Sequence, residues 1–251
     1  MHRFYLPPAQ TRDPELTLSE RDAHHALNVL RVRPGERVVV LDGAGQELLC
    51  EVRMVERQAV KLIVRQRNLI PPLPYQLTLV QAVLKGKAMD LIVQKAAELG
   101  AHRIMPIVSE RTVTQLAGEA AGNRTNKWEA AAVEAIKQCG SAWLPQVEPP
   151  LSPQAFLARQ EKFDLPLLAS LQPASRHPRD YFQTFELEQG RLPRTVSVWV
   201  GPEGDFTPAE INAIKSSGAL PITLGPLILR SETAAIYCLS VLNYELQAAR
   251  V

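Results

Sequence analysis

The stretch that decides the fold lies near the C-terminus and reads Val198-Trp199-Val200-Gly201-Pro202-Glu203-Gly204-Asp205-Phe206. Apolar residues alternate from 196 to 200, which suits a buried strand, and the glycines that follow allow a turn with close backbone approach to another molecule. The next residues, Thr207-Pro208-Ala209-Glu210, form a capping box with proline at the first helical position. The sequence therefore predicts a strand, a turn and a helix in direct succession.

A second unit of the same kind reads Leu224-Gly225-Pro226-Leu227-Ile228-Leu229-Arg230-Ser231-Glu232-Thr233-Ala234. Residues 220–224 are the predicted strand, Gly225-Pro226 interrupts it, and Ser231 is expected to cap a helix that runs to about Gln247. A turn that opens a helix offers backbone N–H groups to a ligand. Most such turns are plain connections, but the abrupt change from apolar residues to Arg230 favours a binding site.

Together these two turns resemble the SPOUT class of RNA methyltransferases and, within it, the ribosomal RNA small subunit methyltransferase E family. The resemblance implies methylation of N3 of one uridine in 16S rRNA, with S-adenosylmethionine as the methyl donor. It also implies a deep trefoil knot at about 196–248, whose loops hold the donor. Knots are otherwise nearly absent from proteins, so no periodicity in the sequence predicts this one.

Composition narrows the class of protein. The 251 residues suffice for one large or two modest domains, and the net charge of +2 argues against a protein that coats nucleic acid, while leaving room for local basic patches. The chain has no apolar run as long as a membrane span and no apolar signal-peptide core. Its three cysteines are far apart and in no metal spacing. We therefore expect a cytoplasmic protein with no membrane contact and no metal.

Residues 1–72 are predicted to form a small domain of mostly strands. Strand-like runs cover 36–41, 47–54 and 59–65. A helix is expected to begin at Ser19, and several short strands around one helix suggest a small β-barrel. The family resemblance implies that this domain is similar to PUA RNA-binding domains. The stretch Pro71-Pro72-Leu73-Pro74 cannot continue a strand, so the boundary is placed at about residue 72.

The most specific motif of this domain is His24-His25-Ala26-Leu27-Asn28-Val29-Leu30-Arg31-Val32-Arg33. Adjacent histidines on a helix cannot bind one metal from one face, so solvated or capping histidines are the simpler interpretation. The family has an H-x-x-x-V-L-R motif here, which implies that Arg31 and Arg33 contact RNA. Arginine near a helix end also interacts favourably with the helix dipole, so both interpretations remain open.

Residues 73–251 are predicted to form the SPOUT methyltransferase domain, an α/β domain with a mostly parallel sheet. Strands are expected at 76–80, 104–108, 163–170, 196–200 and 220–224, and further helices at 87–99 and 126–138. Because strands alternate with helices, the sheet should be covered on both faces.

Two further blocks of this domain match the family. Lys85-Gly86-Lys87-Ala88-Met89-Asp90 is similar to its first block, and Ser109-Glu110-Arg111 resembles its Ser-Glu-Arg block. On this basis Lys87 and Arg111 are predicted to contact RNA. Arg111 also follows the carboxyl end of a strand, where α/β proteins build their sites. A solvated surface is the alternative interpretation of such charges.

The sequence departs from the family at two places. Leu227 stands where the family usually has Arg, and Ser141-Ala142-Trp143 stands where it often has Arg. Both departures remove positive charge. We expect them to affect RNA affinity or target choice more than donor binding.

Methyl transfer from a sulfonium is one displacement and requires no covalent nucleophile. Alignment alone can lower such a barrier by roughly 7–11 kcal/mol. We predict that Arg230 is catalytic and stabilises the charge that develops on the uracil oxygens. Glu203 and Glu232 are candidates to accept the N3 proton, although each also suits a structural role. The predicted donor-binding residues are Val200, Gly201, Pro202, Glu203, Gly204, Leu224, Gly225, Ile228, Leu229, Thr233 and Ala234.

The predicted partner is 16S rRNA, free or in the small ribosomal subunit, with the Watson–Crick edge of the target uridine exposed. A homodimer is expected because SPOUT enzymes generally pair through the last helix, although its apolar stripe would look the same as an intrachain core. That stripe consists of Ile236, Leu239, Leu242, Asn243 and Leu246. Two alternatives remain: a related enzyme with another target, such as a tRNA ribose hydroxyl, and a non-catalytic RNA-binding or assembly protein.

Overall fold

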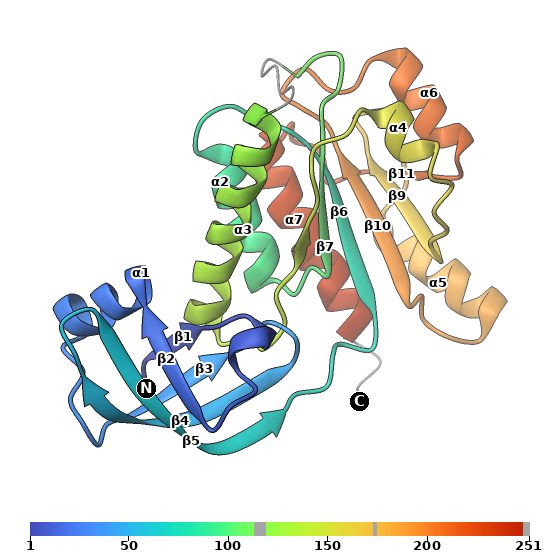
Figure 1. Ribbon diagram of the computed structural model, residues 1–251. Helices are drawn as coiled ribbons and strands as arrows, with labels where there is room; N and C mark the ends of the chain where they lie inside the picture. Colours follow the sequence, from blue (N-terminus) through green and yellow to red (C-terminus); the bar gives the residue numbers. More distant parts are fainter. Residues whose placement is uncertain (113–118, 173–174, 248–251) are drawn as a thin grey trace. The chain divides into compact units, whose positions relative to one another are not determined.

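The computed structural model describes residues 1–112, 119–172 and 175–247 (Figure 1). The chain divides into two compact units. The first unit consists of residues 1–72 together with 133–144, and the second of 73–132 together with 145–251. Helix α3 (Glu119–Cys139) therefore begins in the second unit and ends in the first. The sequence instead assigned residues 133–144 to the second domain.

The first unit is built on a five-stranded sheet with strand order β1-β3-β4-β5-β2. Its strands are β1 (Arg3–Tyr5), β2 (Glu15–Ser19), β3 (Arg37–Leu41), β4 (Gln46–Val55) and β5 (Ala59–Leu69), with a 3₁₀ turn at Pro8–Gln10. Strands β1 and β3 pair in parallel, and the other neighbours are antiparallel. Strands β3 to β5 confirm the three predicted runs. Strand β1 has three residues, too few for an alternating pattern to be visible in the sequence.

The predicted N-terminal helix is present but changes its winding. Helix α1 (Glu20–His24) continues as a π-helical turn, η2 (His25–Leu30), which ends at Arg31. Arg31 adopts a left-handed conformation with φ of 55°, and its backbone N–H donates to the Ala26 carbonyl. The wide turn exposes Arg31 at the helix end while Ala26 stays buried.

Residues 133–144 belong to the first unit because of specific bonds. Lys137 Nζ donates to Asp22 Oδ1 at 3.1 Å, and Trp143 Nε1 donates to the Ile70 carbonyl at 3.0 Å. A side-chain carbon on Gly45 would lie 2.5 Å from the Trp143 ring, so glycine is required there. The Ser141-Ala142-Trp143 departure thus completes the packing of this unit.

The second unit is an α/β domain whose six neighbouring strands all run parallel, in the order β11-β9-β10-β6-β7-β8. They are β6 (Gln76–Ala82), β7 (Arg103–Ile107), β8 (Gln146–Val147), β9 (Leu165–Ala169), β10 (Thr195–Val200) and β11 (Leu220–Ile222). The predicted α/β class with a mostly parallel sheet is confirmed. The expected strand at 220–224 ends earlier because Thr223 Oγ1 accepts a bond from Gly225 N and opens a turn.

Helices cover both faces of this sheet (Figure 1). They are α2 (Ala88–Glu98), α3, α4 (Pro153–Leu157), α5 (Pro178–Gln189), α6 (Pro208–Ser216) and α7 (Ser231–Gln247). On one face, Met105 and Trp199 pack in a core with Phe156 of α4 and Ile214 of α6. On the other face, α7 contacts β6, β10, α2 and α5.

Helix α6 starts as predicted. Thr207 Oγ1 accepts a bond from Glu210 N at 3.3 Å, and Glu210 Oε2 accepts one from Thr207 N at 2.8 Å. This reciprocal pair is the predicted capping box.

The apolar stripe of α7 is mostly used within the chain. Leu239, Leu242 and Leu246 are buried, so the stripe expected at a dimer interface is largely intrachain core. The exposed face of α7 consists of Thr233, Tyr237, Ser240, Tyr244 and Gln247. Among the described residues, no helix combines the length and apolar character needed to cross a membrane.

Candidate active site

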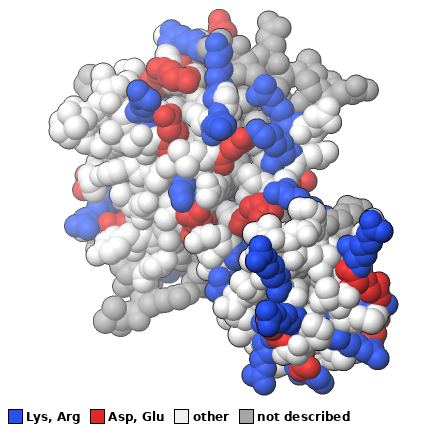
Figure 2. Space-filling view, turned by 90° about the vertical axis from the view of Figure 1, so that its left-hand side faces the viewer, with Lys and Arg blue, Asp and Glu red and all other residues white. Residues whose placement is uncertain are grey.

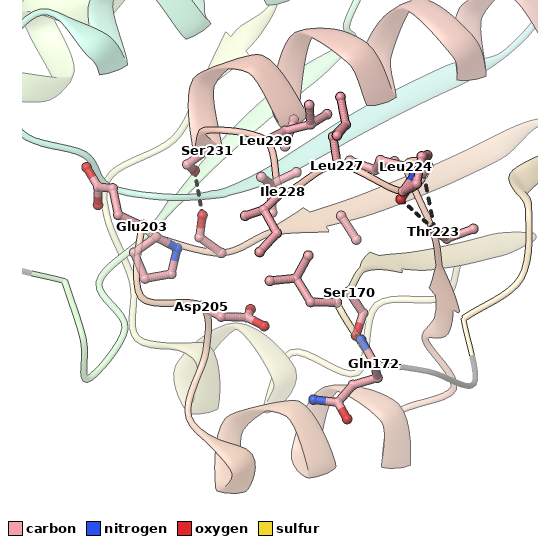
Figure 3. Close-up of a pocket in the computed structure, with 18 residues that line it drawn as sticks. Ser170, Gln172, Glu203, Asp205, Thr223, Leu224, Leu227, Ile228, Leu229 and Ser231 are labelled. Atoms are coloured by element: carbon pink, nitrogen blue, oxygen red, sulfur yellow. Dashed lines mark hydrogen bonds between the residues drawn. The ribbon is translucent and has the colours of Figure 1, made fainter.

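Three loops enclose a cavity of about 310 Å³ at one edge of the parallel sheet (Figure 3). The loops follow β9, β10 and β11, which are neighbours in the sheet and end at the same edge. Ligands of open α/β sheets bind outside the carboxyl ends of the strands. The lining residues are 169–172 at the end of β9 and after it, 200–203 and Asp205 at the end of β10 and after it, and 223–229 after β11, with Ser231 and Ala234 of α7.

The structure brings most of the predicted donor-binding residues together at this cavity. Nine of them line it: Val200, Gly201, Pro202, Glu203, Leu224, Gly225, Ile228, Leu229 and Ala234. Gly204 and Thr233 are not among the lining residues. The two turns singled out in the sequence therefore meet, while their individual contacts with a donor stay predictions.

The sequence did not point to the third wall of the cavity. Ser170 and Gln172 line it from the loop after β9 (Figure 3). No glycine-rich turn follows the expected strand at 163–170, so no motif in the sequence marks the loop after it. Parallel pairing with β10 brings the end of this strand to the cavity, and no local sequence pattern shows that pairing.

The rim of the cavity is apolar and exposed. Leu227 and Ile228 are 74% and 82% exposed, although both line the cavity. Gly225 has φ of 104°, a conformation that favours glycine, and this residue allows the sharp turn that presents them. Exposed apolar side chains at a cavity mouth are typical of a surface that a flat, largely apolar ligand group covers.

A buried hydroxyl links the two turns. Ser231 Oγ donates to the Gly201 carbonyl at 2.5 Å (Figure 3). The same oxygen accepts a bond from Gln81 Nε2 at 3.1 Å. Gln81 is fully buried, and its Nε2 also donates to the Ala82 carbonyl. The prediction that Ser231 caps α7 is therefore wrong. Its hydroxyl joins the start of α7 to the first turn and to the end of β6.

Two arginines lie at the turns themselves. Arg111 Nη1 donates to the Gly204 carbonyl at 2.6 Å. Its loop is held by a buried carboxylate, because Glu210 Oε1 accepts a bond from Glu110 N at 2.9 Å. Arg230 is exposed, and its carbonyl accepts the bond from Ala234 N that starts α7. Arg230 does not line the cavity but immediately precedes Ser231, which does.

The remaining predicted RNA-binding residues are distributed over both units. Lys87 is exposed at the N-terminal end of α2. Arg31 and Arg33 are exposed on the first unit. Within the second unit, none of the bonds found among the described residues joins the Lys87 side chain to the cavity loops.

The chemistry available at the cavity is alignment and electrostatics. Burial raises the pKa of the Cys238 thiol in α7 to about 12, so this thiol stays protonated and unreactive at neutral pH. Within the described ranges, no group of three or more His, Cys, Asp or Glu is arranged to hold a metal ion. What the loops offer is backbone polar groups, apolar surface, two carboxylates and neighbouring arginines.

Two family models match the chain. A model described as an RNA methyltransferase domain matches residues 71–243, and one described as an RNA methyltransferase PUA domain matches residues 18–65. Together with the parallel sheet and its edge cavity, these matches define the chain as an RNA methyltransferase with an N-terminal PUA domain.

Similar proteins indicate which family of RNA methyltransferases the chain belongs to. The chain is 30% identical over 256 residues to ribosomal RNA small subunit methyltransferase E of Bacillus subtilis, covering 100% of this chain and 99% of the relative. A methyltransferase from Legionella pneumophila, solved with its cofactor S-adenosylmethionine, is 32% identical with a TM-score of 0.86 over 98% of this chain and 97% of the other. Ribosomal RNA small subunit methyltransferase E from Neisseria gonorrhoeae, bound to S-adenosylmethionine, is 29% identical with a TM-score of 0.83 over 96% of each chain.

The chain belongs to the ribosomal RNA small subunit methyltransferase E family. This confirms the family expected from the two turns, and with it the class of enzyme.

Proposed function

We propose that this chain transfers the methyl group of S-adenosylmethionine to N3 of a specific uridine in the 16S rRNA of the small ribosomal subunit. The observation that carries the proposal is the cavity at the carboxyl ends of β9, β10 and β11, with exposed apolar residues at its rim and Arg230 beside it. A cytoplasmic location follows from a ribosomal substrate.

The described residues fit the methyl donor. Ile228 and Leu229 would cover the adenine, and backbone groups of the two glycine-containing turns would hold its polar edges. S-adenosylmethionine supplies the electrophilic methyl group when bound. The protein's contribution is to fix its conformation and to exclude water from the transfer path. A trefoil knot in this part of the chain belongs to the same proposal.

In the reaction, the N3 lone pair forms the bond to the methyl carbon while the carbon–sulfur bond breaks, and the N3 proton passes to a base. Arg230 is the proposed electrostatic clamp for the uracil oxygens. Glu232 lies half-buried in the first turn of α7. The Glu203 carboxylate points away from the cavity residues after β9 (Figure 3). Glu203 lines the cavity and Glu232 does not, and both carboxylates are candidates for the proton acceptor.

RNA binding is proposed for the exposed basic residues Arg31, Arg33, Lys87 and Arg111. Figure 2 shows many Lys and Arg side chains over the first unit, in the lower part of the view. Several are paired with acids, such as Arg53 with Glu15 and Arg65 with Glu51. The structure shows no acidic partner for Arg31 or Arg33 among the described residues, which supports a free role toward phosphate.

A homodimer is proposed through the exposed face of α7. Tyr237 and Tyr244 are 42% and 66% exposed and lie seven residues apart, on one side of the helix. The double variant Tyr237→Asp/Tyr244→Asp should shift the protein from dimer to monomer in light scattering, because two carboxylates would be buried without partners. Leu187→Asp, at an exposed site on α5, is the matched control and should leave the mass unchanged. A wild-type monomer at micromolar concentration would refute this part of the proposal.

The decisive experiment uses labelled S-adenosylmethionine and 30S subunits from cells that lack the endogenous enzyme, followed by nucleoside analysis. We expect 3-methyluridine from the wild type and at least a hundredfold less from Arg230→Ala, with donor affinity largely retained. Arg194→Ala, an exposed arginine at the opposite ends of the strands, should keep full activity. Label in another nucleoside would overturn the target, and loss of donor binding in Arg230→Ala would overturn its role.

A further inference from the structure

The cavity has an unusual charge balance. Of the 18 described residues that line it, the only ones with charged side chains are Glu203 and Asp205, and both are acidic. In Figure 3 the Asp205 carboxylate points toward the cavity residues after β9, whereas Glu203 points away from them. A negative charge inside a partly enclosed cavity acts through a lower effective dielectric than one in open water.

Asp205 is held in an uncommon backbone conformation. Its φ is 58°, in the left-handed region that residues other than glycine rarely adopt. Aspartate is one of the few residues that adopt this conformation, because its short side chain can bond the neighbouring backbone. The conformation therefore fixes where the Asp205 side chain starts.

The position of the carboxylate is fixed at the cavity wall. Asp205 Oδ1 accepts a bond from Phe206 N at 2.7 Å. A side-chain carbon on Gly201 would lie 2.9 Å from the same oxygen, so the carboxylate lies over the Gly201 backbone. The structure gives Asp205 Oδ2 no hydrogen-bond partner among the described residues, which leaves it available to a ligand in the cavity.

We infer that Asp205 makes the site select the charged methyl donor over the spent product. This inference rests on the proposed function. S-adenosylmethionine is a net cation at neutral pH, because its sulfonium adds to a zwitterionic amino acid group. Methyl transfer converts the sulfonium to a neutral thioether, so the product S-adenosylhomocysteine carries no net charge. A fixed anion in the wall attracts the donor and gains nothing comparable from the product, which favours product release and renewed donor binding.

The variant Asp205→Asn tests this selectivity without disturbing the turn. Asparagine tolerates the left-handed conformation, and its side-chain oxygen can still accept from Phe206 N. Calorimetry should show donor affinity lower by about fivefold and product affinity changed by less than about twofold. An analogue with a protonated amine in place of the sulfonium should lose affinity in Asp205→Asn by about the same factor as the donor. The product inhibition constant, divided by the KM for the donor, should fall by about the same factor.

Two comparisons make the result decisive. Glu203→Gln removes a carboxylate from the same turn that points away from the cavity, so its donor-to-product affinity ratio should stay within about twofold of the wild type. An equal fall of the ratio in Glu203→Gln would assign selectivity to the net charge of the turn and overturn the role of Asp205. If Asp205→Asn lowered the affinities for donor and product by the same factor, the proposed role of Asp205 would also be wrong. A wild type that binds neither ligand would instead refute the proposed function itself.

Discussion

Ser231 is a small side chain with a large expected effect. Its hydroxyl is the only group that joins Gln81 Nε2 to the Gly201 carbonyl in the described structure. Ser231→Ala removes one partner from the buried Gln81 amide and one from the part-buried Gly201 carbonyl. It should cost about 1–3 kcal/mol of unfolding free energy and weaken donor binding. Urea denaturation and calorimetry measure both.

The matched control is Thr184→Ala on α5, where the hydroxyl is exposed and bonds the Asp180 carbonyl. This change should alter stability by less than about 0.5 kcal/mol. Equal effects of the two substitutions would mean that the link between the turns contributes nothing specific.

The free arginines of the first unit give a second test. Arg31→Ala and Arg33→Ala should each weaken rRNA binding and lower its salt dependence, because each removes a cation with no acidic partner. Arg65→Ala, which removes an arginine paired with Glu51, should have less effect. Filter binding at several salt concentrations distinguishes them. A larger loss for Arg65→Ala would place the RNA surface elsewhere on this unit.

Asp164 ties the beginnings of two central strands together. It lies just before β9, accepts bonds from Arg191 Nη1 and Nη2, and also accepts one from Arg194 N just before β10. The bond with Arg191, assisted by these backbone donors against some desolvation, lowers the pKa of this carboxyl to about 2.

A folded-state pKa below the unfolded value of about 3.9 means that the ionised carboxylate stabilises the fold above that pH. The contribution is lost as the pH falls toward about 2. We therefore expect Asp164→Asn to cost about 1–2 kcal/mol at neutral pH, and the difference from the wild type to narrow between about pH 4 and pH 2. Urea unfolding across this range measures it. If the difference in unfolding free energy between wild type and Asp164→Asn did not depend on pH, the destabilisation would come from altered packing and not from the lost charge.

The strength of local signals explains which elements could be predicted. Two elements have a clear local pattern in the sequence. They are the start of α6, with its capping box at Thr207 and Glu210, and the apolar run of β10. Strand β8 has two residues and helix α4 has five, which is too few for a periodic pattern, so the only local signal for α4 is its start at Ser152-Pro153. The cavity wall at Ser170 and Gln172 depends on strand order, which is a property of tertiary pairing rather than of any one segment.

At the site, the two turns were predictable because their residues are unusual, while the roles of single side chains were not. Ser231 has the identity of a helix cap, but burial against Gly201 and Gln81 overrides that local preference. No local pattern in the sequence singles out Asp205, and only its backbone conformation and its place in the cavity lining draw attention to its carboxylate.

Trp143 should control the stability of one unit selectively. Its indole N–H bonds the Ile70 carbonyl, and its ring covers Gly45. We expect Trp143→Ala to destabilise the first unit by about 2–4 kcal/mol, so that amides of β4 and β5 exchange hydrogen faster while those of β6 and β10 do not. Leu187→Ala, at a site 87% exposed, should leave both sets unchanged. If amide hydrogen exchange became faster by the same factor in all four strands, the two units would unfold together.

The division of α3 between the two units limits how this protein can be rearranged in evolution. The chain passes from one unit to the other after residues 72, 132 and 144, so neither unit is a single continuous piece of the gene. A recombination event that transplants only the first 72 codons would deliver a module without its Trp143 segment. If the protein arose by fusion of two complete domains, the segment 133–144 must have joined the first unit afterwards. A lineage that lost one unit would also lose residues next to the other in the sequence, so the remaining unit would need new residues in their place.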